Sequence, residues 1–182
     1  MNLTTVFQPF EKASLLDSVS DPIASGLRSL LDGSPVDGLL RGTFIGHPMH
    51  PIMAYSSVGL WSSAVLLDLT GGNAAASQRL IGAGLITAPT ALATGWATWS
   101  TLNAEQRRVG LVHASTNAVA LSLFAASYRR RAKAPTATAP DTTSKALALA
   151  GIAVASLGGA LGGHLGFNMG AGVASRAKPA GV

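Results

Sequence analysis

Four long uncharged stretches limit what this chain can fold into more than any other feature of its sequence. No Asp, Glu, Lys or Arg interrupts residues 42–67, 80–104, 109–128 or 146–175. Each stretch contains the roughly 20 apolar residues that an α-helix needs to cross about 30 Å of hydrocarbon. A soluble domain would instead have amphipathic helices with regular charged faces. The sequence therefore predicts an all-α integral membrane protein, a four-helix bundle preceded by an N-terminal amphipathic, interfacial helical segment.

The chain divides into three predicted parts: the N-terminal segment (1–42), the four-span bundle (43–173) and a short basic tail (174–182). The spans are expected at about residues 51–67, 80–102, 109–128 and 146–168. In the first part, Ser18 to Leu31 has the periodicity of an amphipathic helix, and Pro35 to Arg41 fits a short second helix. These helices suit the membrane interface or a partner surface, and a soluble cap packed on the loops is an equal alternative. A Pro- and Thr-rich connection, 134–144, is expected to be flexible.

Composition excludes several classes of function. The net charge is +5, but the basic residues cluster at span ends, where they meet lipid head groups. Aromatic residues are sparse and are not interleaved with basic ones, so no nucleic-acid partner is expected. Because the chain has no cysteine, it can itself hold no disulfide, thiolate metal site or iron–sulfur cluster. No cleavable signal peptide is expected either, because no apolar h-region precedes the first span.

The four histidines are predicted to lie at one side of the membrane. With four spans connected in order, the N-terminus, the second loop and the C-terminus share one side, which we call face A. His47 and His50 lie at the face A entrance of the first span, His113 just inside the third, and His164 near the face A end of the fourth. Histidines within spans are rare and usually face the bundle interior. We therefore expect four imidazoles in one leaflet, with His113 and His164 as the better-placed pair.

Three roles for these histidines stay open. Two could be axial ligands of a b-type haem, which suits electron transfer. Three or four could bind zinc or copper. With no cofactor, they could hydrogen-bond across helices and hold the bundle together.

Neighbouring residues could support a cofactor site. Asn117 and Asn168 follow His113 and His164 by four residues and could orient their imidazoles by hydrogen bonds. Three basic residues lie at the right level to meet anionic groups such as haem propionates: Arg41, Arg107 and Arg108. The glycines within 158–163 would admit either a neighbouring helix or a flat cofactor.

The usual catalytic groups do not come together in this sequence. Asp68 and Glu105 are predicted at opposite membrane faces, and no Ser-His-acid set is indicated. We interpret Asp68 as a span-end residue that could pair with Arg79, and the run 129–131 as a topological anchor. The positive-inside rule slightly favours a cytoplasmic location for that run, with the histidines on the outer side. The chain is therefore not expected to be an enzyme by itself.

An ordered series of motifs resembles a known family. The series comprises Gly46-His47-Pro48-Met49-His50-Pro51, Asp68, residues 106–114 (QRRVGLVHA), Asn117, Ala126-Ser127-Tyr128 and Leu161-Gly162-Gly163-His164-Leu165. It resembles an uncharacterised four-helix bacterial membrane family, a domain of unknown function, over roughly residues 10–173. The resemblance implies a four-span bundle in the bacterial cytoplasmic membrane. In actinobacterial relatives the domain is often fused to a C-terminal Rieske iron–sulfur domain, which implies a place near redox chemistry.

The working hypothesis is a multi-pass membrane protein that binds b-type haem through two of His47, His50, His113 and His164, or alternatively zinc or copper through three or four of them. It would transfer electrons with a separate Rieske-type or other redox partner on face A, because this chain ends at Val182 without a Rieske domain. The alternative is a non-catalytic membrane anchor or assembly scaffold with structural histidines.

Overall fold

A computed structural model describes residues 3–134 and 139–172 and confirms the predicted all-α bundle. Four helices are long and apolar enough to cross a membrane: α4 (Met49–Leu69), α5 (Ala74–Trp99), α6 (Ala104–Ala132) and α7 (Thr142–Gly163). α7 continues into a π-helical turn, η3 (His164–Asn168). Each predicted span falls on one of these helices. Part of the connection expected to be flexible and the predicted basic tail lie outside the described residues.

Three further helices precede the bundle. α2 (Asp17–Leu31) and α3 (Asp37–Arg41) confirm the two predicted helices, and single 3-10 turns, η1 (Ser14–Leu16) and η2 (Thr43–Ile45), flank them. The sequence does not predict α1 (Leu3–Glu11), because Pro9 lies inside it and proline disfavours a helix interior. α1 is held by tertiary contacts, since Phe7 and Phe10 pack against apolar residues of the bundle.

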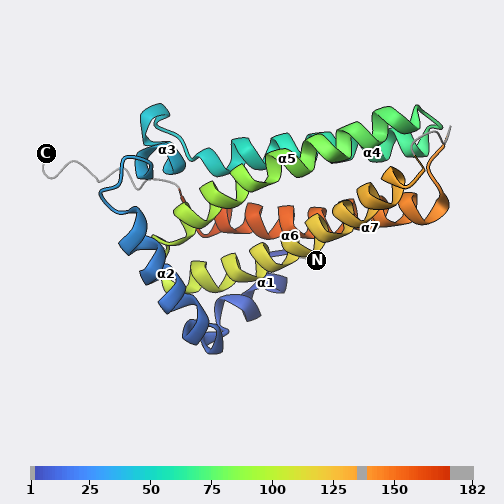
Figure 1. Cartoon of the computed structure of the whole chain (residues 1–182). Coiled ribbons are helices and arrows are strands. Elements are labelled where there is room, and N and C mark those ends of the chain that lie inside the picture. The colour runs from blue at the N-terminus through green and yellow to red at the C-terminus, as the bar shows by residue number, and fades with distance from the viewer. Residues whose placement is uncertain (1–2, 135–138, 173–182) are drawn as a thin grey trace, which may run out of the picture.

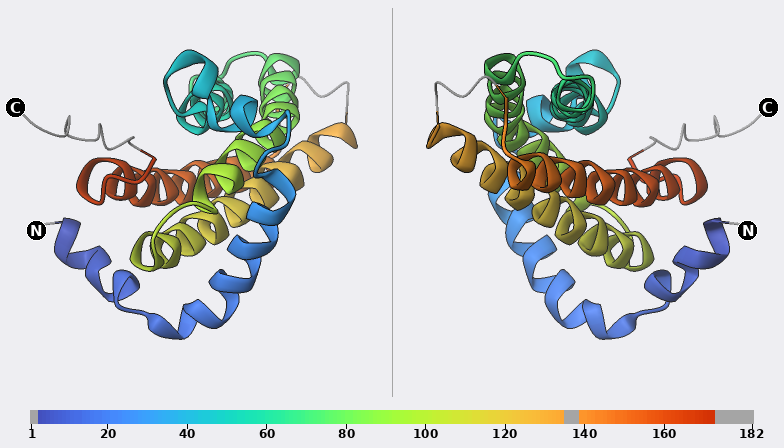
Figure 2. Two further views of the ribbon diagram at one scale, coloured as in Figure 1. Left: turned by 90° about the vertical axis from the view of Figure 1, so that its left-hand side faces the viewer. Right: turned by 90° about the vertical axis from the view of Figure 1, so that its right-hand side faces the viewer.

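The spans form two antiparallel hairpins, α4–α5 and α6–α7 (Figure 1). α5 also packs on α6, and α4 on α7, so α4 and α6 lie diagonally across the bundle. The helices α1 and α2 pack on α6, and Figure 2 shows them as an arm beside the α6–α7 hairpin. The N-terminal helices lie at the end where α4 and α6 begin, which is therefore the face A end.

The two hairpins repeat one another. Three pairs of residues meet across the diagonal between α4 and α6: His50 with His113, Trp61 with Phe124, and Asp68 with Arg131. The members of each pair are 63 residues apart. The residues of α5 and α7 that lie beside these pairs also repeat, at a second constant spacing that is slightly larger. They are Ser77 and Ser144, Gly84 and Gly151, and Gly95 and Gly162. The bundle is thus a parallel repeat with a pseudo-two-fold axis along the spans.

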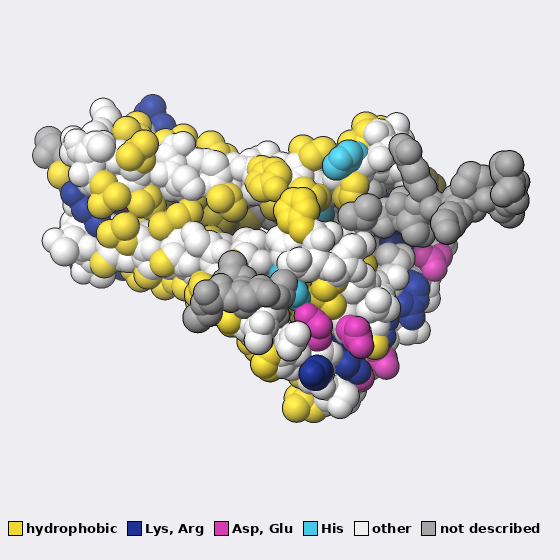
Figure 3. Space-filling model, turned by 180° about the vertical axis from the view of Figure 1, so that it is seen from behind, with side chains coloured by type: hydrophobic (Ala, Val, Ile, Leu, Met, Phe, Trp, Pro, Cys, Tyr) yellow, Lys and Arg dark blue, Asp and Glu magenta, His cyan; other side chains and the backbone are white. Residues whose placement is uncertain are grey.

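The sides of the bundle are apolar and uncharged over most of the face seen in Figure 3. Large apolar side chains on the spans remain well exposed, among them Ile86 (79%), Leu157 (63%) and Leu66 (61%). Exposed apolar surface of this extent suits contact with lipid chains rather than water. The same view shows acidic side chains gathered at the face A end.

Candidate functional site

The structure brings two histidines together between α4 and α6, near the face A end of the bundle. His50, in the first turn of α4, faces His113 of α6, with ring centroids 5.9 Å apart and ring planes nearly perpendicular. Because α4 and α6 are diagonal helices, the imidazoles meet on the axis that relates the two hairpins. We call this pair the paired-histidine site.

Each imidazole of the paired-histidine site is fixed by a backbone carbonyl of the other helix in its own hairpin. His50 Nδ1 lies 2.9 Å from the Ala91 carbonyl oxygen, and His113 Nδ1 lies 2.8 Å from that of Gly158. A carbonyl oxygen can only accept, so both Nδ1 atoms carry the proton. In the neutral imidazole the Nε2 lone pair is then available to a ligand. This is the tautomer that a metal-ligating histidine adopts when its other nitrogen donates to a carbonyl.

Glycines allow the rings to lie this close to the neighbouring helices. A Cβ atom on Gly95 would be 2.8 Å from His50 Nδ1, and one on Gly162 would be 3.0 Å from His113 Cε1. Both distances are shorter than normal packing contacts, so a side chain at either position would make the imidazole shift. Gly158 and Gly162 thus face side chains of α6, which fits the helix-packing interpretation of the 158–163 glycines.

Asn117 lies against His113 in the way its spacing predicts. Its Nδ2 donates to the His113 carbonyl oxygen at 3.0 Å and lies 3.3 and 3.2 Å from the two ring nitrogens. An atom almost equidistant from both nitrogens does not lie along the Nε2 lone pair. Asn117 therefore buttresses the ring without blocking Nε2.

His164 has a different environment, and this corrects the expectation that it would be the partner of His113. Its Nε2 is 2.7 Å from Glu11 Oε1, and its Nδ1 is 3.3 Å from Asn168 Nδ2. Its ring also packs on Phe7, with centroids 5.2 Å apart. Both nitrogens are occupied, so His164 joins α1 to the end of α7. The expectation was wrong because the sequence does not predict α1, which places Glu11 beside His164.

His47 stands apart from the other three histidines, in an exposed bend before α4. Over residues 3–134 and 139–172, the structure contains no group of three or more His, Cys, Asp or Glu that could hold a metal ion. The site that this part of the chain assembles is therefore a pair of imidazoles rather than a cluster of three or four.

The arginines near face A are occupied by acidic residues of the N-terminal segment. Arg108 forms two hydrogen bonds with the Asp17 carboxylate, at 2.8 and 2.6 Å. Arg107 pairs with Asp21 at 2.6 Å, and Arg41 pairs with Asp37 at the same distance. The Arg107 and Arg108 contacts fasten α2 to α6, whereas the Arg41–Asp37 pair lies within α3. The three arginines expected to meet haem propionates are thus paired with carboxylates of the chain itself.

A second polar cluster lies at the opposite end of the bundle, and it corrects the expected pairing of Asp68 with Arg79. Asp68 instead forms a two-point ion pair with Arg131, and both side chains are only 3% exposed. Ser77 donates to Asp68 at 2.7 Å, and Ser127 accepts from Arg131 at 3.1 Å. We call these four residues the arginine network.

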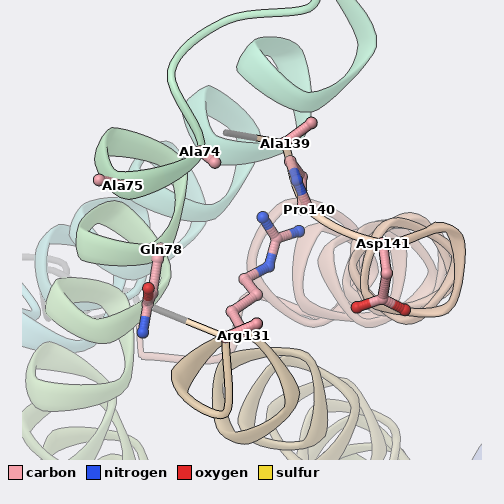
Figure 4. A pocket seen from close by; sticks show the side chains of 8 residues that line it. Ala74, Ala75, Gln78, Arg131, Ala139, Pro140 and Asp141 are labelled. Atoms are coloured by element: carbon pink, nitrogen blue, oxygen red, sulfur yellow. The ribbon is translucent and has the colours of Figure 1, made fainter. Parts of the chain in front are cut away.

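Arg131 is therefore a buried residue of the bundle, whereas its neighbours Arg129 and Arg130 are exposed. Beside the network is a small depression of about 120 Å³, in which Figure 4 shows Arg131 below Pro140 with Gln78 and Asp141 on either side. Because the guanidinium is already paired with Asp68, the network is a closed structural unit.

Some residues of these sites are not evident from sequence. The carbonyl groups of Ala91 and Gly158 cannot be identified as acceptors from sequence, because any residue has a backbone carbonyl. Gly95 and Gly162 do indicate where another group lies close to the helix. Glu11 becomes evident only once α1 is recognised, and the available signal is the helical spacing of three residues between Phe7 and Phe10.

Comparisons with known proteins give one match. The model of the family described as predicted membrane protein (DUF2231) matches residues 46–175, more than half of the chain. No curated protein and no solved structure matches this chain.

Proposed function

We propose, from the premise that the chain belongs to the DUF2231 family of predicted membrane proteins, that it is an electron carrier that binds one b-type haem between His50 and His113. The observation that supports this most is the pairing of two imidazoles on the pseudo-two-fold axis, each with Nδ1 fixed and Nε2 available. Cofactor sites in helical bundles are characteristically built from side chains on facing helices of the core.

The residues present fit such a group in their chemistry. Two neutral imidazoles form the donor set, and each donates its other ring proton to a backbone carbonyl, which makes the ligating nitrogen more basic. His50 and His113 would hold the group, and the haem would supply reversible one-electron transfer when bound. Both imidazoles are partly buried between apolar spans.

The chain's own residues would set the position of the imidazoles. Carbonyls of α5 and α7 fix the ring orientation, Gly95 and Gly162 let the rings lie against those helices, and Asn117 supports the ring of His113. Because the site lies near the face A end, the redox partner would dock there. A Rieske-type protein in a bacterial cytoplasmic membrane is the partner that the motif resemblance implies.

The test is the absorption spectrum of the protein purified in detergent from haem-supplemented cells, with metal analysis of the same sample. We expect a Soret band in the wild-type protein and its loss in His50→Asn and His113→Asn. Asparagine keeps a donor in the place of Nδ1 but offers no ligand. The matched controls, His47→Asn and His164→Asn, should keep the band, because these histidines do not belong to the pair.

A structural role for the histidines is the second candidate, and the same carbonyl bonds favour it. Each bond joins the two helices of one hairpin, and His164 joins α1 to α7. A colourless wild-type protein whose stability falls in His50→Asn and His113→Asn would support this role and reject haem binding.

A further inference from the structure

We infer that α2 lies in the face A leaflet of the membrane and that a lipid acyl chain occupies the groove between α2 and α6. This inference is independent of the proposed haem site, because it depends on a different surface.

The amphipathic pattern of α2 is inverted relative to that of a cap exposed to water. Its charged residues, Asp17, Asp21 and Arg28, contact the bundle: they bind Arg108, Arg107 and the Ser100 carbonyl oxygen. Three apolar residues repeat the same spacing two positions further on: Val19, Ile23 and Leu30. Two residues of an α-helix turn by about 200°, so the apolar side chains lie on the side of α2 opposite its charged residues.

These apolar side chains are largely exposed, which is unfavourable in water. Leu30 is 75% exposed, Val19 51% and Ile23 39%, and Leu15 before the helix is 77% exposed. The neighbouring exposed residues are uncharged: Pro22 and Gly26 on the outer side of α2, and Ser18, Ser25 and Ser29 on its flank. Asp21, whose side chain is 58% exposed beside Arg107, is the exception. The rest of the exposed surface of α2 lacks the charges that a solvent-facing helix carries.

The apolar stripe of α2 continues into the side of a membrane span. Leu16 and Val19 form one wall of a groove of about 330 Å³, and Leu111, Val112, Ser115 and Thr116 of α6 form the other. About one turn further along this side of α6, Val119 is 52% exposed. Because α6 is a candidate span, its outer side meets lipid, and the groove opens toward the same lipid.

A lipid fits this surface better than a protein partner does. Protein-binding surfaces are enriched in Trp, Tyr and Arg, whereas Leu, Val and Ser are under-represented among their energetically important residues. The outer side of α2 contains Val19, Ile23 and Leu30 and no Trp, Tyr or Arg. A helix that buries an apolar side at the boundary between head groups and acyl chains needs no specific partner.

The test uses the absence of cysteine from the chain. Single variants Val19→Cys, Leu30→Cys and Ser115→Cys are labelled with an environment-sensitive fluorophore and reconstituted into phosphatidylcholine–phosphatidylglycerol vesicles. Their fluorescence is compared in vesicles with and without brominated acyl chains, and with iodide in the water. Ser29→Cys, on the flank of α2, is the matched control, and Ile86→Cys marks a lipid-facing position in a span.

We expect brominated lipid to quench the labels at 19, 30 and 115 nearly as strongly as the label at 86, and several-fold more than the label at 29. Iodide should quench the label at 29 most. Labels at 19 and 30 that iodide reaches and brominated lipid does not would show a water-exposed cap and overturn the inference. Labels protected from both quenchers would show that a protein covers α2, which also overturns it.

Discussion

The two ends of the bundle carry different residues at equivalent diagonal positions of α4 and α6, and only one end has its polar groups fully paired. At the face A end these positions are His50 and His113, whose Nε2 atoms remain available while Nδ1 is bound. At the other end, about five helical turns away, they are Asp68 and Arg131, whose hydrogen bonds are directed at one another and at serines. One repeated backbone thus holds a pair of potential ligands at one end and a self-sufficient ion pair at the other.

This difference indicates which end fixes the structure and which end is suited to function. A buried ion pair is tolerated when its geometry is good and additional hydrogen bonds complete it, as they do here. The arginine network includes side chains from α4, α5 and α6 and reaches the Ser144 carbonyl oxygen of α7 through Ser127. It therefore joins all four spans, whereas the paired histidines leave bonding capacity unused.

The largest effect is expected from breaking the arginine network. Asp68→Ala leaves the Arg131 guanidinium buried without its counter-ion, which should lower the free energy of unfolding by about 3–5 kcal/mol. Denaturant titration in detergent, followed by tryptophan fluorescence, measures it. The Soret band, where present, should persist in protein that remains folded, because the histidines are at the other end.

The repeat supplies the control for this prediction. The exchange variant Asp68→Arg with Arg131→Asp places each charge at the equivalent position of the other hairpin, beside the equivalent serine. It should recover most of the stability lost by either single substitution. An exchange variant as unstable as the single variants would show that the two hairpins are not equivalent at this level.

The fold follows from sequence more completely than the sites do. Uncharged length alone locates α4 to α7, because the requirement to span the membrane leaves few alternatives. The pairing of Asp68 depends on which helices are diagonal, and sequence spacing does not contain that information. The repeat is similarly hidden, because only some equivalent positions carry the same residue: positions 50 and 113 are both His, but position 61 is Trp where 124 is Phe, and position 68 is Asp where 131 is Arg.

A medium effect is expected at the face A end from Gly158→Ala. The added Cβ would lie 2.5 Å from Asn117 Oδ1, so Asn117 and the His113 ring that it supports must move. Overpacking of this kind costs about 1–3 kcal/mol. Gly159→Ala is the matched control, because a Cβ there meets nothing within 4 Å, and it should leave thermal stability unchanged or slightly raised.

The repeat again provides a compensating change for the clash at Gly158. The positions equivalent to Asn117 and Gly158 in the first hairpin are Ala54 and Ala91, both alanine. Asn117→Ala combined with Gly158→Ala recreates that pair and should restore much of the lost stability. A double variant no better than Gly158→Ala would contradict the proposed cause.

The smallest effect is expected from Asp17→Asn, which tests how the N-terminal helices are attached. Hydrogen bonds from Arg108 lower the pKa of Asp17 below its ordinary value of 3.8. Since the folded pKa is below the unfolded one, the contact contributes stability above pH 3.8 and loses it as the pH falls through the lower, folded value. The wild-type protein should therefore melt at a higher temperature than Asp17→Asn at pH 7, and the difference should vanish well below pH 3.8. A difference in melting temperature that does not depend on pH would mean that Asp17 acts through packing. The Asp17–Arg108 ion pair would then not be what holds α2 on the bundle.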